Sequence, residues 1–265
     1  MTTAQTLAEL ASDAYSQNPA KDLPAGFAPV DLPGLQMHNG LFSDGSAQAA
    51  VSLGVLDGDQ VLVVAFRGSD HRQDWIDDLR DINAEYPNFQ PLISAVEDYA
   101  NAGGKVVVVG HSLGGAMAQV FMSQHAGDDQ YRAVTFGSPG ALPEAGVFAA
   151  HADTRITNYQ VSDDPFVFLG EHRAEIAALA NQDPAFAAGL AAELSKLTHL
   201  SVKQIAASLS AITADYVNDG TTVFLPGAEA SVTLGNLLAT DPAEHDPSLY
   251  VALTGASSLF EPQLW

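Results

Sequence analysis

A short segment of the sequence surrounds one serine with the residues that a nucleophile needs. Residues 105–115 read KVVVVGHSLGG, in which an apolar run leads into the pattern G-x-S-x-G centred on Ser112, and an apolar helical stretch follows. Where a strand turns sharply into a helix, side chains two positions before and after the serine would clash, and glycine avoids that clash. The turn lifts the hydroxyl clear of the backbone at the positive end of the helix. We therefore predict that Ser112 is a nucleophile.

A serine hydroxyl reacts poorly until a histidine accepts its proton and an acid orients that histidine. The strand–turn–helix serine indicates an α/β-hydrolase fold, in which the order along the chain is serine, acid, histidine. The stretch NYQVSDDPFV supplies a strand that ends in Asp163 and Asp164, and one of these is the expected acid. The histidines that follow are His172, His199 and His245.

The elements that would position these residues alternate between strands and helices, which predicts a central, mostly parallel sheet flanked by helices. Apolar runs predict strands at 47–55, 60–66, 105–109, 133–136 and 156–161. Helical periodicity predicts helices within 1–15, at 91–102 and 113–125, and after Asp246-Pro247. We expect one α/β-hydrolase domain that spans residues 1–265.

The character of the sequence changes between residues 171 and 217, which are rich in alanine and leucine. Breaks at Asp183-Pro184 and near Thr198 predict three short helices, a helical cap or insertion between the acid and the histidine. Its apolar residues form a stripe at three- and four-residue steps: Ile176, Leu179, Phe186, Leu190, Leu194 and Leu197. After it, the turn residues at 218–220 predict that strands 221–225 and 231–234 pair as a hairpin.

Charge and composition exclude several classes of function. Ten basic and 32 acidic residues give a formal net charge of −22, which opposes binding to nucleic acid. No apolar run approaches the roughly 20 residues of a transmembrane helix, so no integral membrane segment is expected. Cysteine is absent, which excludes disulfides and thiolate zinc ligands. The N-terminal residues lack the pattern of a secretory signal, although we expect an extracellular protein, with a cytoplasmic location as the alternative.

Several motifs, in the correct order between residues 47 and 169, resemble those of the class 3 lipases, the relatives of the filamentous-fungal triacylglycerol lipases. They are FRGS at 66–69, DWIDDL at 74–79, GHSLGGA at 110–116, TFGSP at 135–139 and DDP at 163–165. Each motif is short, and the specificity comes from their order. A weaker similarity continues at the C-terminus.

The resemblance implies a role for particular residues. The family's acid motif is similar to D-x-V-P-x-L-P, which fits Asp164 better than Asp163 because Leu169 lies five positions after Asp164. The family's histidine precedes a short helix with a tyrosine, and the sequence HDPSLY beginning at His245 is similar. The backbone of Leu113 and, by resemblance, of Ser69 would form the oxyanion hole.

In the fungal relatives a helical lid follows the position of Ser69. Here the segment 70–85 is strongly charged, with Trp75 and Ile76 as candidate substrate contacts, so it is a poor lid for an oil surface. The interval of 245 − 164 = 81 positions between Asp164 and His245 is longer than is usual in the family. The extra helices either cap the pocket or only pack at the edge of the sheet. We expect His111, within the serine motif, to point away from the site.

These features predict an acyl-ester hydrolase, with a triacylglycerol lipase as the favoured enzyme. It would use Ser112, Asp164 and His245 and require no metal or other cofactor. A phospholipase A1 and a short-chain or feruloyl-type esterase are the alternative enzymes, because the catalytic residues do not distinguish among them. A lipase-like binding module without activity is the alternative of another class. The expected partner is a lipid or another small ester, and the sequence does not determine the oligomeric state.

Overall fold

The computed structural model describes residues 1–68, 82–142, 153–198, 201–209, 212, 214–256 and 261–265. Its strands form one nine-stranded sheet in the order β2-β3-β4-β5-β6-β7-β8-β9, with β1 paired to β4. The strands are β1 Ala28–Pro29, β2 Met37–His38, β3 Leu41–Asp44, β4 Ala47–Leu56, β5 Asp59–Phe66, β6 Lys105–His111, β7 Tyr131–Phe136, β8 Ile156–Val161 and β9 Thr221–Leu225. Strands up to β5 pair antiparallel, and β5 to β9 pair parallel.

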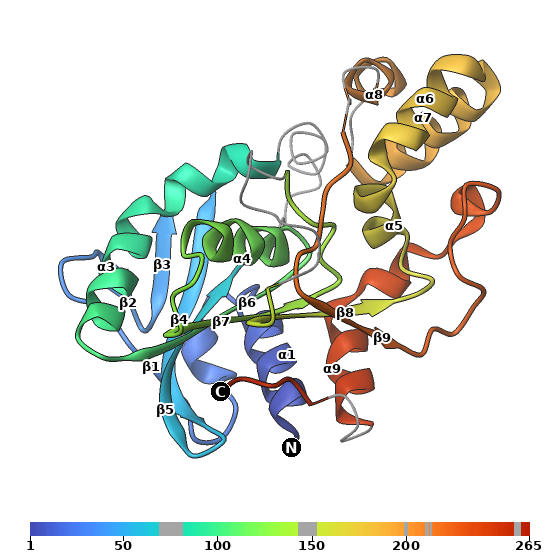
Figure 1. The fold of residues 1–265 in the computed structure, drawn as a ribbon. Coiled ribbons are helices and arrows are strands. Elements are labelled where there is room, and N and C mark those ends of the chain that lie inside the picture. Colours follow the sequence, from blue (N-terminus) through green and yellow to red (C-terminus); the bar gives the residue numbers. More distant parts are fainter. Residues whose placement is uncertain (69–81, 143–152, 199–200, 210–211, 213, 257–260) are drawn as a thin grey trace.

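Helices cover both faces of this sheet (Figure 1). The α-helices are α1 Thr3–Asp13, α3 Gln90–Asn101, α4 Leu113–Gln124, α5 Pro165–Glu171, α6 Arg173–Gln182, α7 Pro184–Thr198, α8 Val202–Leu209 and α9 Pro247–Gly255. Short 3-10 helices are η1 Pro19–Lys21, η2 Ile82–Phe89, η3 Leu237–Ala239 and η4 Pro242–His245. This arrangement is the α/β-hydrolase fold that the sequence predicts.

The alternation of side chains along β6 explains the two layers. Val106 and Val108 point into the core beneath α3 and α4, whereas Val107 and Val109 point into the core beneath α1 and α9. All four are fully buried, as a central strand with an apolar residue at every position requires. The end of β6 therefore lies at the middle of the molecule, with packed helices on both sides.

The predicted hairpin at the C-terminal side of the insertion is wrong. Thr221–Leu225 forms β9, but it pairs parallel with β8, in the register Thr157 to Thr221 and Val161 to Leu225. Residues 231–234 form no strand. The long connection through α5 to α8 returns the chain to the N-terminal end of β8, so that β9 can run parallel to β8. Val232 packs in the apolar cluster of the insertion.

The three helices expected between residues 171 and 217 are α6, α7 and α8, which project beyond the α/β core (Figure 1). The apolar stripe packs mostly within this part of the molecule. Leu190 and Leu194 are 2% and 5% exposed, and they share a separate apolar cluster with Phe166 and Leu169 of α5 and Leu237 of η3. The insertion is thus anchored to the helix that follows Asp164.

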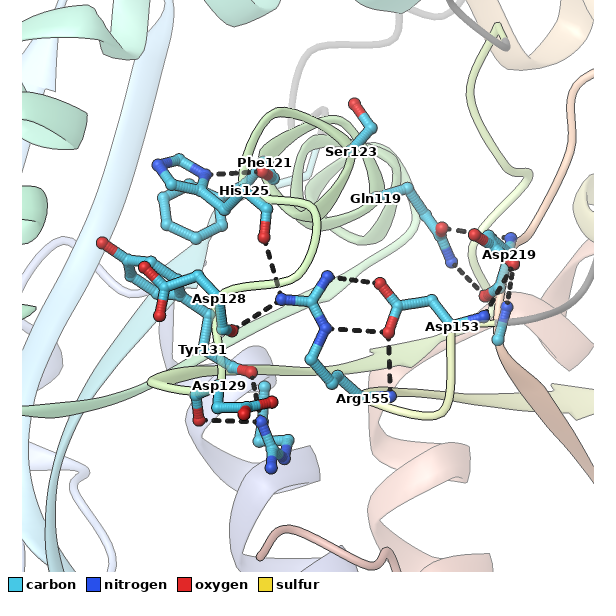
Figure 2. A network of polar contacts seen from close by, with 12 residues as sticks. Gln119, Phe121, Ser123, His125, Asp128, Asp129, Tyr131, Asp153, Arg155 and Asp219 are labelled. Carbon is cyan, nitrogen blue, oxygen red and sulfur yellow. Dashed lines mark hydrogen bonds and ion pairs between the residues drawn. The ribbon is translucent and has the colours of Figure 1, made fainter. Parts of the chain in front are cut away.

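A polar network fixes the far end of α4 (Figure 2). The guanidinium of Arg155 donates from Nη1 to the carbonyls of His125 and Asp128, at 2.8 and 2.6 Å, and forms an ion pair with Asp153. Near the middle of the helix, the Gln119 side chain exchanges hydrogen bonds with the backbone of Asp219, just before β9. His125 is the C-cap of α4, and a cation that donates to a carbonyl at that end satisfies it and interacts favourably with the negative end of the helix dipole.

We expect Arg155→Met to lower the free energy of unfolding by about 3 kcal/mol, because it leaves the half-buried Asp153 unpaired and frees two carbonyls. Urea unfolding followed by circular dichroism would measure the loss. Lys21→Met, which removes an exposed cation, is the matched control and should change stability little. An Arg155→Met protein as stable as the wild type would contradict this role of the network.

Candidate active site

The turn between β6 and α4 carries Ser112 in a strained backbone conformation. Its φ of 58° and ψ of −128° lie in a region that residues with a side chain rarely adopt. A Cβ on Gly110 would lie 2.1 Å from the carbonyl carbon of Gly114, and a Cβ on Gly114 would lie 2.1 Å from the carbonyl oxygen of Phe66. Both glycines are therefore required by backbone atoms that cannot move aside, as the motif predicts.

Ser112, His245 and Asp164 form one chain of hydrogen bonds. His245 Nε2 lies 2.8 Å from Ser112 Oγ, and His245 Nδ1 lies 2.7 Å from Asp164 Oδ2. The three side chains are nearly excluded from solvent, since Ser112 is 3%, Asp164 1% and His245 6% exposed. In this geometry Nδ1–H donates to the carboxylate, which leaves Nε2 free to accept the proton of the serine hydroxyl.

The carboxylate of Asp164 is held by the backbone and by a tyrosine. Asp164 caps α5, and its Oδ1 accepts from the N–H groups of Phe166 and Val167 at 2.8 and 3.3 Å. The Tyr250 hydroxyl, from α9, donates to Oδ2 at 2.6 Å. Burial, and then the charge of Asp164, raise the pKa of Tyr250 well above its ordinary value, so Tyr250 remains a donor. These bonds fix the carboxylate in the orientation that His245 requires.

The neighbouring aspartate has a different role. Asp163 is also buried, but its Oδ2 accepts from the backbone N–H of Glu229 at 2.6 Å, in the loop after β9. Successive side chains at the end of β8 point in different directions, so only one of the two carboxylates reaches His245. The structure brings Asp164, the residue favoured by the resemblance, to the histidine.

We expect Asp164→Asn to lower kcat by about 10⁴, because an amide favours the wrong tautomer of His245. Asp163→Asn keeps the shape of its side chain and does not touch His245, so it should lose less than tenfold. Rates on a soluble p-nitrophenyl ester, with circular dichroism to check folding, compare the two variants. A larger loss in folded Asp163→Asn would reverse the assignment.

The other candidate bases lie elsewhere. The His172 side chain is 43% exposed, stacks on Phe168 and lies 3.6 Å from the Glu175 carboxylate. His199 lies outside the described residues, as do Ser69, Trp75 and Ile76. Leu113 is the first residue of α4, so its N–H opens that helix directly beside Ser112.

The expectation that His111 points away from the site is wrong. Its ring centroid lies 4.6 Å from that of His245, and its Nδ1 lies 3.0 Å from the hydroxyl of Tyr15. The side chain of His111 points to the same face of β6 as Val109, towards α1 and α9, and His245 immediately precedes α9. Burial, and then the charge of His245, lower the pKa of His111 well below its ordinary value, so it stays neutral beside His245.

The sequence alone does not assign three residues that contact the site or its histidines: Tyr250, Tyr15 and Phe166. The tyrosine in HDPSLY was visible as part of the resemblance, but its bond to Asp164 was not. Nothing in the sequence relates Tyr15 to His111, which are 96 positions apart. The Phe166 ring lies 4.5 Å from the ring of His245, between centroids, and forms one side of the site.

Within the described part of the chain, no group of three or more histidine, aspartate or glutamate side chains could hold a metal ion. Among the helices with described residues, none is both long and apolar enough to cross a bilayer.

A family model described as a Tle-like phospholipase domain matches residues 6–216 of the chain. The chain belongs to this family. The matched part of this Tle-like domain includes Ser112 and Asp164, whereas His245 lies beyond it. The predicted membership of a lipolytic α/β-hydrolase family is confirmed, and the chain is accordingly a lipolytic hydrolase with a lipid or ester substrate.

Comparison of the Tle-like domain with curated proteins gave no match. Solved structures similar to it include lipase II from Rhizopus niveus, with 16% identity over 63% of this chain and 73% of that chain, at a TM-score of 0.47. A mutant Penicillium cyclopium protein has 19% identity over 61% and 71%, at 0.45. The Rhizomucor miehei lipase propeptide complex has 22% identity over 64% and 62%, at 0.44. The family assignment depends on the domain model, and the fold on the sheet and helices described above.

Proposed function

We propose that this protein is a serine carboxylic-ester hydrolase that cleaves acyl esters of glycerolipids through an acyl-enzyme. One observation carries the proposal: the unbroken hydrogen-bond chain from Ser112 Oγ through His245 to Asp164, at 2.8 and 2.7 Å. A binding module without activity has no need of a strained serine or of a buried carboxylate aligned with a histidine. The geometry therefore favours the enzyme over the binding module.

In the proposed reaction Ser112 Oγ attacks the ester carbonyl carbon while its proton passes to His245 Nε2. The developing oxyanion accepts a hydrogen bond from the N–H of Leu113 and, as the resemblance implies, from that of Ser69. The C–O bond to the alcohol then breaks, and His245 returns the proton to the leaving oxygen. Water, deprotonated by His245, releases the fatty acid and restores the serine. Asp164 stabilises the imidazolium in both halves.

Triacylglycerol is the substrate that the sequence motifs favour. A phospholipid is the second candidate, and the observation that favours it is the match to a phospholipase domain model over residues 6–216. Both substrates present the same acyl ester to Ser112, so the catalytic residues alone do not choose between them. In this proposal residues 1–265 form one domain, in which the helices between 171 and 217 are an insertion. Parts of the domain outside the catalytic residues would select between the two lipids.

Two measurements test the proposal. A fluorophosphonate probe should label the wild-type protein and not Ser112→Ala, because labelling requires an activated serine. Fatty acid release is then compared between a triolein emulsion and phosphatidylcholine vesicles. Equal labelling of the wild type and Ser112→Ala would contradict the serine mechanism. Faster release of fatty acid from the vesicles than from the emulsion would indicate a phospholipase.

A further inference from the structure

A largely apolar cavity lies between the insertion and the site. It holds about 640 Å³ of empty space, part of which is open to solvent. The walls come from α5, α7, η3 and η4. Six of the lining residues are hydrophobic side chains from α5, α7 and η3: Phe166, Leu169, Leu190, Leu194, Leu237 and Leu238.

One wall of the cavity belongs to residues that adjoin Asp164 and His245. Pro165 and Phe166 directly follow Asp164, and the Phe166 ring lies 4.5 Å from the His245 ring, between centroids. Pro242 begins η4, the 3-10 helix that ends at His245. A ligand in the cavity would thus contact Phe166, which in turn packs against the ring of His245.

The opposite wall is supplied by α7 of the insertion. Leu190 and Leu194 present buried hydrocarbon, and α7 approaches η3 so closely that a Cβ on Gly189 would lie 2.9 Å from Leu238 Cδ1. Leu238 is 39% exposed and lines the cavity, so it marks the side that opens to solvent. Glu193 is the charged residue of the lining.

We propose that this cavity binds one hydrocarbon chain of the ester substrate, and that α7 sets the length of chain accepted. The proposal rests on the proposed function, since it names a group of the ester substrate. Each methylene buried in an apolar site favours binding by roughly fourfold. A chain that fills the cavity should therefore be preferred to a short one, until it meets Leu190 and Leu194.

The first experiment measures kcat/KM of the purified full chain on p-nitrophenyl butyrate and p-nitrophenyl octanoate. Leu190→Phe narrows the cavity, and Leu238→Glu places a charge at its exposed side without disturbing a buried residue. Both should lower the octanoate-to-butyrate ratio of kcat/KM by about tenfold or more. Leu209→Phe, in the same apolar cluster but away from the cavity, and Val202→Glu, on the exposed side of α8, are the matched controls.

A parallel series of butyl and octyl acetates tells which chain of the ester lies in the cavity. If the variants lower the octanoate-to-butyrate ratio of the p-nitrophenyl esters, the acyl chain lies in the cavity. If they lower the octyl-to-butyl ratio of the acetates, the alcohol chain lies there. Both results support a hydrocarbon site. If Leu238→Glu, folded by circular dichroism, keeps the wild-type ratio in both series, the cavity does not bind the substrate.

A second experiment separates this proposal from the catalytic one. Binding of the fluorescent fatty acid cis-parinaric acid to Ser112→Ala requires no turnover, and Leu238→Glu in that background should weaken it by about tenfold, whereas Val202→Glu should not. If the wild type hydrolyses no ester and this binding pattern holds, the proposed function fails, and the cavity is a hydrocarbon site that does not serve ester hydrolysis. If esters are cleaved but Leu238→Glu changes neither the kcat/KM ratios nor the binding of cis-parinaric acid, the proposed function stands and the cavity proposal fails.

Discussion

Replacing Ser112 with alanine is expected to lower kcat on p-nitrophenyl butyrate by about 10⁶, since removing the nucleophile of a serine hydrolase costs about as much as removing its whole catalytic triad. The Oγ that would attack lies 2.8 Å from His245 Nε2, and alanine keeps the backbone but supplies no oxygen there. Some acceleration over water should remain, from the oxyanion hole and from substrate binding.

The loss is measured by steady-state rates on highly purified protein, because a trace of wild type would mask it. The melting temperature should change little, since alanine replaces serine without adding volume. Ser123→Ala, at the other end of α4, is the matched control and should keep full activity (Figure 2). Near-normal turnover by Ser112→Ala would mean that another residue is the nucleophile.

The second large effect is expected for His245→Ala, which should also lower kcat by about 10⁶. Without the imidazole, no group accepts the proton of Ser112, and the carboxylate of Asp164 faces an empty space. Tyr250 and the first turn of α5 would still hold that carboxylate, so the protein should remain folded.

His172→Ala and His199→Ala are the controls for this prediction, because the sequence offers all three histidines after the acid. The His172 ring lies at the surface beside Glu175, so its loss should change the rate less than threefold. The same is expected for His199. An inactive His199→Ala that keeps the wild-type circular dichroism spectrum would move the base from His245 to His199.

The sequence was informative wherever the constraint is local. The two glycines around Ser112 are required by backbone atoms within the same turn and the adjacent strand end, so a pattern of five residues was enough to predict the elbow. The strands β4 to β8 were predictable because each buries an apolar run, and α9 because Asp246 caps it and Pro247 begins it. Such features depend on sterics and hydrogen bonds between near neighbours.

Only the tertiary structure decided which residues meet across long separations. His245 lies 81 positions from Asp164 and 133 from Ser112, and three histidines and two aspartates fit the order that the fold demands. The structure unites one of each: Asp164 follows β8, which β7 separates from β6, and His245 ends η4, just before α9. Composition and periodicity contain no information on such closures, since a loop of any length can make them.

The same reason explains the two expectations that failed. A strand-like run such as Thr221–Leu225 pairs with whichever neighbour its connection reaches, and here the insertion carried it to β8. The expectation that His111 faces away failed because the contacts of its side chain depend on where the chain returns before α9. The apolar stripe of the insertion was readable in the sequence. That it packs on α5 and encloses a cavity lined by Phe166 follows only from the fold, because the hydrophobic effect favours burial without specifying the partner.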